Sequence, residues 1–323
     1  MNSTWIVAEK ELLDLRRGRL FAILIGFLAV ATLISVAAAS ADFRNQLDAY
    51  NLYVANLATS GSTVAAAAPQ LFPLKLLRGG VEYLEILGAL FAIVLGYGTI
   101  AKEKHRGTLH LFLSRPVGRF AFAGGKVLGL SIVWLGVVAA LTAVSLVAVV
   151  TIGHAPIQGI DVARLLIAGG FAWLYLVFWT ALAVGLTALS TRLSTGLIVA
   201  LVIWLAFVLI IPQIGDTMDP DNQVPGGLFA TLQIQKPDEL AVLAQFSAFD
   251  GIRNGLEASS VTKHFERLTF AFLGIKDQYN QQPLSLMWAA MLPYAITLTA
   301  ATLAAVVFAA LATTRRTLQR KQS

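Results

Sequence analysis

The sequence predicts an all-α protein that crosses a membrane six times. Of its 323 residues, 57% are hydrophobic and only 13% are charged, about half the charged fraction that is usual in soluble domains. The apolar residues are gathered into six runs, each long enough to cross a hydrocarbon core of about 30 Å as a helix. The predicted spans are about residues 20–39, 83–101, 127–152, 162–189, 195–214 and 287–312.

Residues 1–19 are predicted to form an amphipathic helix that lies flat at the cytoplasmic interface. Trp5 and Leu12 can share one side of this helix, while Glu9 and Lys10 lie on the other. A strongly two-sided helix with an aromatic anchor is typical of an interfacial helix. The acidic residues, and the lack of a small-residue cleavage site, argue against a signal peptide. The alternative interpretation is an ordinary cytosolic tail.

Two long polar segments, residues 40–82 and 213–283, are predicted to lie outside the membrane and to contain helices. In the first segment, a helix is expected over residues 43–57. In the second, one helix is expected from Asp238 to about residue 257, and another from Ser259 or Ser260 to about residue 279, because Asp and Ser are favoured N-caps. Residues 313–323 form a basic cytoplasmic tail.

The positive charges predict the orientation. With both termini, the loop 102–126 and the turn around Arg192 placed inside, fifteen Lys and Arg residues lie on the cytoplasmic side and nine on the other. Cytoplasmic loops of membrane proteins carry such an excess of basic residues. The net charge of +6 therefore indicates orientation rather than nucleic-acid binding, and no nucleic-acid partner is expected.

The loop between the second and third predicted spans has three parts. A charged run, residues 102–106, stops the span, residues 108–114 can form about two turns of helix, and Pro116 and Gly118 break that helix. A short helix held between two long spans can act as a lever, because a force applied to it tilts both spans.

The order of residues in this loop resembles the first intracellular loop of type-2 ABC exporter permeases, also called ABC-2-type permeases. In that family an acidic-basic run precedes Gly-Thr-Leu, an apolar helix, a Ser-x-Pro-x-x-Arg turn and Gly-Lys at the next span. The matching residues here are Glu103, Gly107-Thr108-Leu109, Leu111-Phe112-Leu113, Ser114 to Arg119 and Gly125-Lys126. Residues 102–126 are called the coupling segment below.

The resemblance implies a permease subunit in a prokaryotic plasma (inner) membrane, with both termini cytoplasmic. Two such subunits would pair, as a homodimer or with a close relative, and two ABC ATPase subunits would dock beneath them. ATP and Mg²⁺ would be held by the ATPase subunits, since Gly125-Lys126 is followed by Val127 and no phosphate-binding loop is present. No cofactor, catalytic residue or metal site is expected on this chain. The residues expected to contact the ATPase subunit are Glu103, His105, Arg106, Gly107, Thr108, Leu109, Phe112, Leu113, Arg115, Pro116 and Arg119.

One departure from the usual pattern is the length of the two external segments. Long external segments resemble the subgroup that includes the permease of the nitrous-oxide-reductase maturation system, and they suggest an extracytoplasmic partner protein. The work done is therefore either substrate export or force transmission to that partner. A substrate path is expected to include Glu82, Glu85, Trp173 and Trp179, although acids near a span end and Trp residues in spans also serve as interfacial anchors.

Two other functions are open on the sequence. An ion-coupled secondary transporter would need ionisable residues or broken helices near the middle of the membrane, and the predicted spans contain few charges. An integral-membrane enzyme would need clustered acids or histidines. The four histidines, His105, His110, His154 and His264, are spread along the chain, and there is no cysteine.

Overall fold

The computed structural model describes residues 3–16, 19–60, 71–105, 121–218, 232, 247–276, 279–280, 282–314 and 317. All regular structure within these ranges is helical. Six helical stretches in them are long and apolar enough to cross a membrane, as predicted: Phe21–Leu57, Pro73–Lys104, Ala121–Thr151, Gly159–Leu189, Leu193–Gly215 and Leu284–Ala312.

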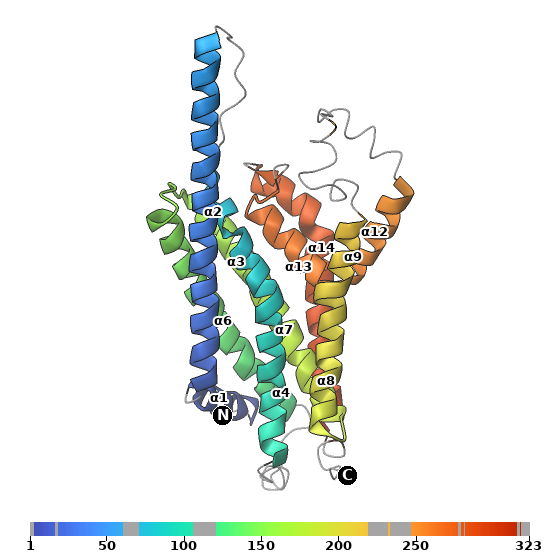
Figure 1. The fold of residues 1–323 in the computed structure, drawn as a ribbon. Helices are drawn as coiled ribbons and strands as arrows, with labels where there is room; N and C mark the ends of the chain where they lie inside the picture. The colour runs from blue at the N-terminus through green and yellow to red at the C-terminus, as the bar shows by residue number, and fades with distance from the viewer. Residues whose placement is uncertain are drawn as a thin grey trace.

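Figure 1 shows the described helices in their order along the chain. The helices are α1 (Ser3–Arg16), α2 (Arg19–Ser60), the 3₁₀ turn η1 (Pro73–Leu77), α3 (Arg78–Tyr83), the π-helical turn η2 (Leu84–Gly88), α4 (Ala89–His105), α6 (Ala121–Thr151), α7 (Gly159–Leu189), α8 (Leu193–Trp204), the π-helical turn η3 (Leu205–Ile210), α9 (Ile211–Thr217), α12 (Ser247–Ser259), α13 (Val261–Phe272) and α14 (Leu284–Ala312).

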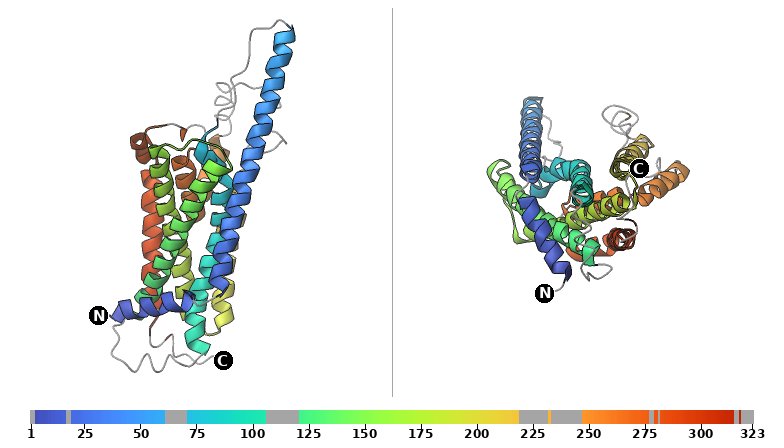
Figure 2. Two further views of the ribbon diagram at one scale, coloured as in Figure 1. Left: turned by 90° about the vertical axis from the view of Figure 1, so that its left-hand side faces the viewer. Right: turned by 90° about the horizontal axis from the view of Figure 1, so that it is seen from below.

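The bundle has two distinct ends. Helix α1 lies crosswise at one end, where α4 and α14 finish and α6 begins (Figures 1 and 2). This end is called the α1 end below. At the opposite end lie α12, α13 and the beginnings of α7 and α14. Successive spans therefore begin at opposite ends of the bundle, as the predicted topology requires.

Helix α7 is the centre of the bundle and packs against α4, α6, α13 and α14. Its Tyr175 is fully buried and stacks on Phe265 of α13, with ring centroids 4.4 Å apart. The indole N–H of Trp134, in α6, donates to the hydroxyl of Thr180 at 2.8 Å. Van der Waals packing and hydrogen bonds between helices of this kind hold membrane helices together, because lipid tails are as apolar as the side chains.

Helix α2 is longer than the predicted first span. It continues without a break to Ser60, so the helix expected over residues 43–57 is the far end of α2 and not a separate element. At 1.5 Å per residue, its 42 residues span about 63 Å, roughly twice a hydrocarbon core. Its far end projects beyond the other helices of the bundle (Figures 1 and 2).

The second and fifth spans also differ from their predicted bounds. Helical structure begins at Pro73, well before the expected residue 83, and reaches His105. The fifth span was expected to end at about residue 214, but α9, which contains Pro212, runs on to Thr217. The π-helical turn η3 lies directly before α9, and such turns accommodate a missing backbone N–H.

The predicted second helix of segment 213–283 begins where expected. The Ser260 hydroxyl accepts a hydrogen bond from the Lys263 amide as the N-cap of α13. The helix ends at Phe272, earlier than residue 279, in a Schellman-type turn with Gly274 at a φ of +64°. Helix α13 packs against α7 and α14 with Phe265 fully buried, so it is part of the bundle. Residues 233–246, including Asp238, lie outside the described residues.

Candidate functional site

At the α1 end, α4 ends within the coupling segment and α6 begins within it. His105 is the last residue of α4, and Ala121 is the first of α6. Glu103 is described in full. The remaining predicted ATPase contacts, Arg106, Gly107, Thr108, Leu109, Phe112, Leu113, Arg115, Pro116 and Arg119, lie outside the described residues, as does the side chain of His105.

A buried ion cluster lies where these two helix ends meet α1. Lys126 of α6 is 0% exposed, and its Nζ lies 2.6 Å from Oε1 of Glu11, 3.5 Å from Oε1 of Glu103 and 3.0 Å from the carbonyl oxygen of Thr99. Both carboxylates are almost fully buried. The ammonium group therefore has a partner for each of its three N–H bonds. We call Lys10, Glu11, Glu103 and Lys126 the Lys126 cluster.

The charges of this cluster are balanced. Glu103 also forms an ion pair with Lys10, whose side chain is partly exposed. Burial lowers the pKa of Lys10, but the hydrogen bond and attraction from Glu103, with Glu11 and Asp14, outweigh it, so this pKa is raised. Two ammonium groups thus face two carboxylates. A buried charge inside a membrane protein is costly unless it is paired in this way.

Two glycines allow α1 to lie close enough for these contacts. A Cβ on Gly125 would lie 2.5 Å from Cβ of Val7 and 2.6 Å from the carbonyl oxygen of Thr4, and one on Gly129 would lie 2.9 Å from the carbonyl oxygen of Ala8. Small residues at this spacing permit close helix contact. The close packing at Gly125 and Gly129 is thus made with α1 of the same chain.

Further ties join the end of α4 to its neighbours. Nζ of Lys104 donates to the carbonyl oxygens of Thr187 and Ser190, at 3.3 and 3.2 Å. These carbonyls end α7, where a positive charge is favoured by the helix dipole. Lys102 pairs with Asp14 of α1 at 3.5 Å. The end of α4 is therefore fastened to α1, α6 and α7.

The residues predicted to line a substrate path lie in different environments. Glu82 is at the surface and pairs with Arg78. Glu85 is buried, and its carbonyl oxygen accepts a hydrogen bond from Tyr175. The Trp173 indole N–H donates to the Ser131 carbonyl oxygen.

Trp179 is 1% exposed within the core. A path through these four residues stays a prediction. In the part of the chain that the structure describes, no three His, Asp or Glu side chains gather as a metal site would require.

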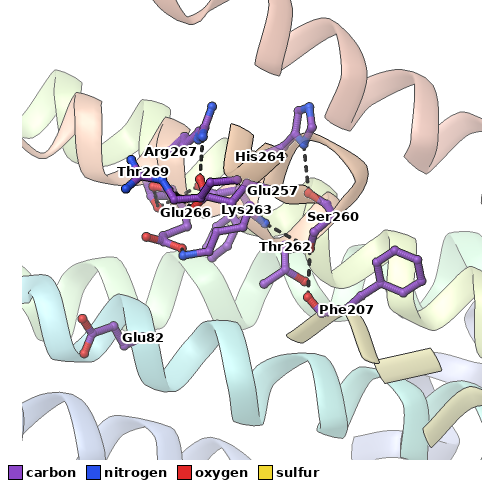
Figure 3. A network of polar contacts seen from close by, with 12 residues as sticks. Glu82, Phe207, Glu257, Ser260, Thr262, Lys263, His264, Glu266, Arg267 and Thr269 are labelled. Carbon is purple, nitrogen blue, oxygen red and sulfur yellow. Dashed lines mark hydrogen bonds and ion pairs between the residues drawn. The ribbon is translucent and has the colours of Figure 1, made fainter. Parts of the chain in front are cut away.

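A second polar network lies at the opposite end, on α12 and α13 (Figure 3). Arg267 donates to Oδ1 of Asn254 at 3.1 Å, to the hydroxyl of Tyr294 at 2.8 Å and to Oε2 of Glu257 at 2.5 Å. Lys263 pairs with Glu266 at 2.7 Å. These side chains border a cavity of about 490 Å³. They hold α12, α13 and α14 together.

The sequence did not predict the roles of three buried charged residues. Glu11 counted only among the acids that argue against a signal peptide, and Lys126 only as part of the Gly125-Lys126 motif at the border of a span. Arg164, discussed below, was counted with the external charges, although it lies within the fourth candidate span. A lysine directly after Gly125 and four residues after Phe122 is a signal of close packing with a buried charge. Only tertiary contacts reveal its partners.

Comparison with known proteins identifies the family. A model of the family described as "ABC-2 family transporter protein" matches residues 5–319. The chain belongs to the ABC-2 family of transporter proteins. It is also similar to NosY of Stutzerimonas stutzeri, described as a probable ABC transporter permease protein, with 24% identity over 266 residues, which cover 78% of this chain and 84% of NosY.

Family membership and the six spans together make this ABC-2 protein a multi-pass membrane protein. The family and the relative support a permease subunit of an ABC transporter, which works with an ABC ATPase. Two members of the Lys126 cluster, Glu103 and Lys126, belong to the coupling segment, whose motif carried the resemblance.

Proposed function

We propose that this protein is the membrane-spanning permease subunit of an ATP-driven exporter, and that a separate ATPase subunit moves it by pressing on the coupling segment. The α1 end faces the cytoplasm of a prokaryotic cell, where the ATPase is found. Two permease subunits and two ATPase subunits make up the working transporter. The excess of Lys and Arg at the α1 end supports this orientation.

The observation that carries the proposal is the Lys126 cluster. Lys126 lies five residues after the first residue of α6, and Glu103 lies two residues before the last residue of α4. Their ion pairs therefore fasten both ends of the coupling segment to one another and to α1. A load applied between these ends is transmitted to α4, α6 and α1 as one body. Without such ties the two helix ends could move separately and the load would dissipate.

The ATPase shifts this permease between states by binding the coupling segment better in one state than in another. No transport step then requires chemistry on this chain. NosY, a relative, is named only as a permease. The long far end of α2, which projects past the bundle, supports contact with a partner protein outside the cell. Such contact fits either export to that partner or mechanical work on it.

Charged substitutions in the coupling segment test the proposal. Leu109→Glu and, separately, Gly107→Glu are expected to abolish stimulation of the ATPase by the permease in liposomes that contain both subunits. Asn51→Glu, on the exposed far end of α2, is the matched control and should leave stimulation unchanged. Assembly is checked by co-purification in detergent. The proposal is wrong if Leu109→Glu assembles normally and keeps full stimulation and transport.

A further inference from the structure

Arg164 is a buried basic side chain in the fourth candidate span that lacks a carboxylate partner. It is 7% exposed. Its Nη2 donates to the carbonyl oxygen of Gln282 at 2.6 Å, while its Nε is buried and has no hydrogen-bond partner. Among the described residues, none forms an ion pair with it. A buried guanidinium with one neutral acceptor is left largely uncompensated.

The environment of Arg164 differs from that of Lys126, another buried cation. Lys126 has two carboxylates and a carbonyl oxygen within 3.5 Å. The nearest acid along the helix from Arg164 is Asp161, and its Oδ2 accepts a hydrogen bond from the backbone N–H of Gln158 at 2.9 Å as part of a capping box. Asp161 is thus committed to capping α7 and forms no ion pair with Arg164. The missing counter-charge has to come from elsewhere.

Arg164 borders a cavity of about 550 Å³ at the end of the bundle opposite α1. This volume is within the usual range of small-molecule sites. Its lining is about equally apolar and polar: Phe72, Leu74 and Ile160 are among the apolar residues, and Asn280 and Asp161 are among the polar ones. A lining of this mixed kind, with a buried guanidinium beside apolar side chains and amides, suits an amphiphilic molecule that is anionic at one point.

Two long helices begin at this cavity. Ile160 and Asp161 belong to the first turn of α7, and Leu284 is the first residue of α14. The beginning of a helix carries partial positive charge and unpaired backbone N–H groups. Pro283, the N-cap of α14, makes no side-chain cap. Asp161 already caps the beginning of α7, so the uncapped beginning of α14 is the helix end that favours an anion near Arg164.

We propose that this cavity binds the oxyanion group, phosphate or carboxylate, of an amphiphilic ligand, with Arg164 as its charge partner. The guanidinium supplies a planar set of donors that matches two oxygens of such a group. The apolar wall takes the hydrocarbon part. An anionic lipid headgroup and a free organic anion both present this chemistry. The site is independent of the coupling segment, which lies at the other end of the molecule.

Replacing Asn280 by the nearly isosteric Asp would place a negative charge of the protein itself in the cavity. A Cβ added to Gly274 would lie 3.6 Å from Oδ1 of Asn280 and 3.7 Å from Nη1 of Arg164, so these two side chains approach a common point. In Asn280→Asp a carboxylate replaces the amide oxygen at that place. This variant should pair with Arg164 and exclude an external anion. Arg164→Gln removes the charge directly.

The test uses the full-length purified protein in nanodiscs of phosphatidylcholine, alone, with added phosphatidylglycerol, or with inorganic phosphate in the buffer. Thermal unfolding gives the midpoint, and native mass spectrometry counts retained phosphatidylglycerol. The wild type should be stabilised by at least one of the two anions. Arg164→Gln and Asn280→Asp should weaken that binding by about tenfold or more, as expected for loss of a charge-assisted contact. Asn51→Asp, on the exposed part of α2, is the isosteric control and should respond as the wild type.

The outcomes separate the sources of the ligand. Stabilisation by phosphatidylglycerol alone identifies a lipid headgroup, and stabilisation by phosphate identifies a free anion. If Arg164→Gln does not fold, the Asn280→Asp variant alone tests the proposal. In phosphatidylcholine without added anion it should unfold at a higher temperature than the wild type, because its new carboxylate pairs with Arg164. The proposal is overturned if neither anion stabilises the wild type, or if Asn280→Asp keeps the full effect.

Discussion

The two ends of the bundle hold their buried charges in different ways. At the α1 end, Lys126 reaches Glu11, 115 residues away along the chain, and Glu103, 23 residues away. At the opposite end, the partly buried Arg267 has Glu257 and Asn254 as partners only 10 and 13 residues away, while the buried Arg164 has a distant backbone carbonyl oxygen but no carboxylate. The first set joins three helices that are distant in sequence, and the second mainly fastens neighbouring short helices. Long-range ties of the first kind make the α1 end able to transmit a load.

The largest expected effect is at Lys126. Lys126→Met would leave two buried carboxylates, Glu11 and Glu103, without their shared cation, at a cost of about 3–5 kcal/mol. Thermal unfolding in detergent measures the loss. The double variant Lys126→Met with Glu11→Gln should recover part of it, because Glu103 keeps Lys10. Equal stability of the single variant and the wild type would contradict a structural role for the cluster.

The next effect tests whether α1 must lie against α6. Gly125→Ala places a Cβ 2.6 Å from a backbone oxygen of α1, so it should destabilise by about 1–3 kcal/mol and reduce ATPase stimulation. Gly136→Ala is the matched control in the same helix, since its Cβ would meet nothing within 4 Å. It should be neutral or slightly stabilising, because alanine is the better helix former. A similar loss in both variants would show that helix propensity, and not the contact with α1, is responsible.

A smaller effect is expected at the opposite end. Arg267→Met removes the main partner of Glu257, which is 9% exposed, and should cost about 1–3 kcal/mol. Stimulation of the ATPase should stay close to that of the wild type once the protein is folded. Measuring stability and ATPase activity on the same preparation separates the two ends. A loss of stimulation as large as that of Leu109→Glu would remove the distinction between them.

The smallest effect is expected at Glu82. Its ion pair with Arg78 is largely exposed, and exposed pairs contribute about 0–1 kcal/mol. Glu82→Gln should therefore leave the unfolding midpoint nearly unchanged. A change in transport rate without a change in stability would support Glu82 as part of the substrate path. Unchanged transport would remove it from that path.

The sequence predicted the six spans, the first helix and the Ser260 cap, because each depends on local patterns of apolar and capping residues. It did not predict that α2 continues to Ser60. Polar residues after Ser40 suggested an external segment with a separate helix over residues 43–57, yet the stretch from Arg19 to Ser60 has no proline, and its one glycine is Gly26. A helix can continue into water when nothing breaks it. The absence of proline, and of glycine after Gly26, was the sequence feature that could have predicted the longer helix.

Local sequence patterns could not predict that α13 and the Lys126 cluster are buried. Phe265, Leu268 and Phe272 share one side of α13 and are all fully buried, but an amphipathic helix has the same pattern on a membrane surface and in a bundle. The charges of Lys126 and Glu11 are 115 residues apart. Hydropathy places each near a boundary and says nothing of their contact. Such partners follow from the packing of whole helices.

Cysteine cross-linking tests the central claim most directly. The chain has no cysteine, so Leu113→Cys introduces a single thiol in the coupling segment, and Asn51→Cys introduces one at the far end of α2 as the control. Each variant is assembled with ATPase subunits that carry single cysteines on the surface facing the permease, and then oxidised. We expect Leu113→Cys to form a disulfide with the ATPase in a nucleotide-dependent way, and Asn51→Cys to form none. A correctly assembled complex in which Leu113→Cys reaches no ATPase cysteine under any nucleotide condition would contradict the account.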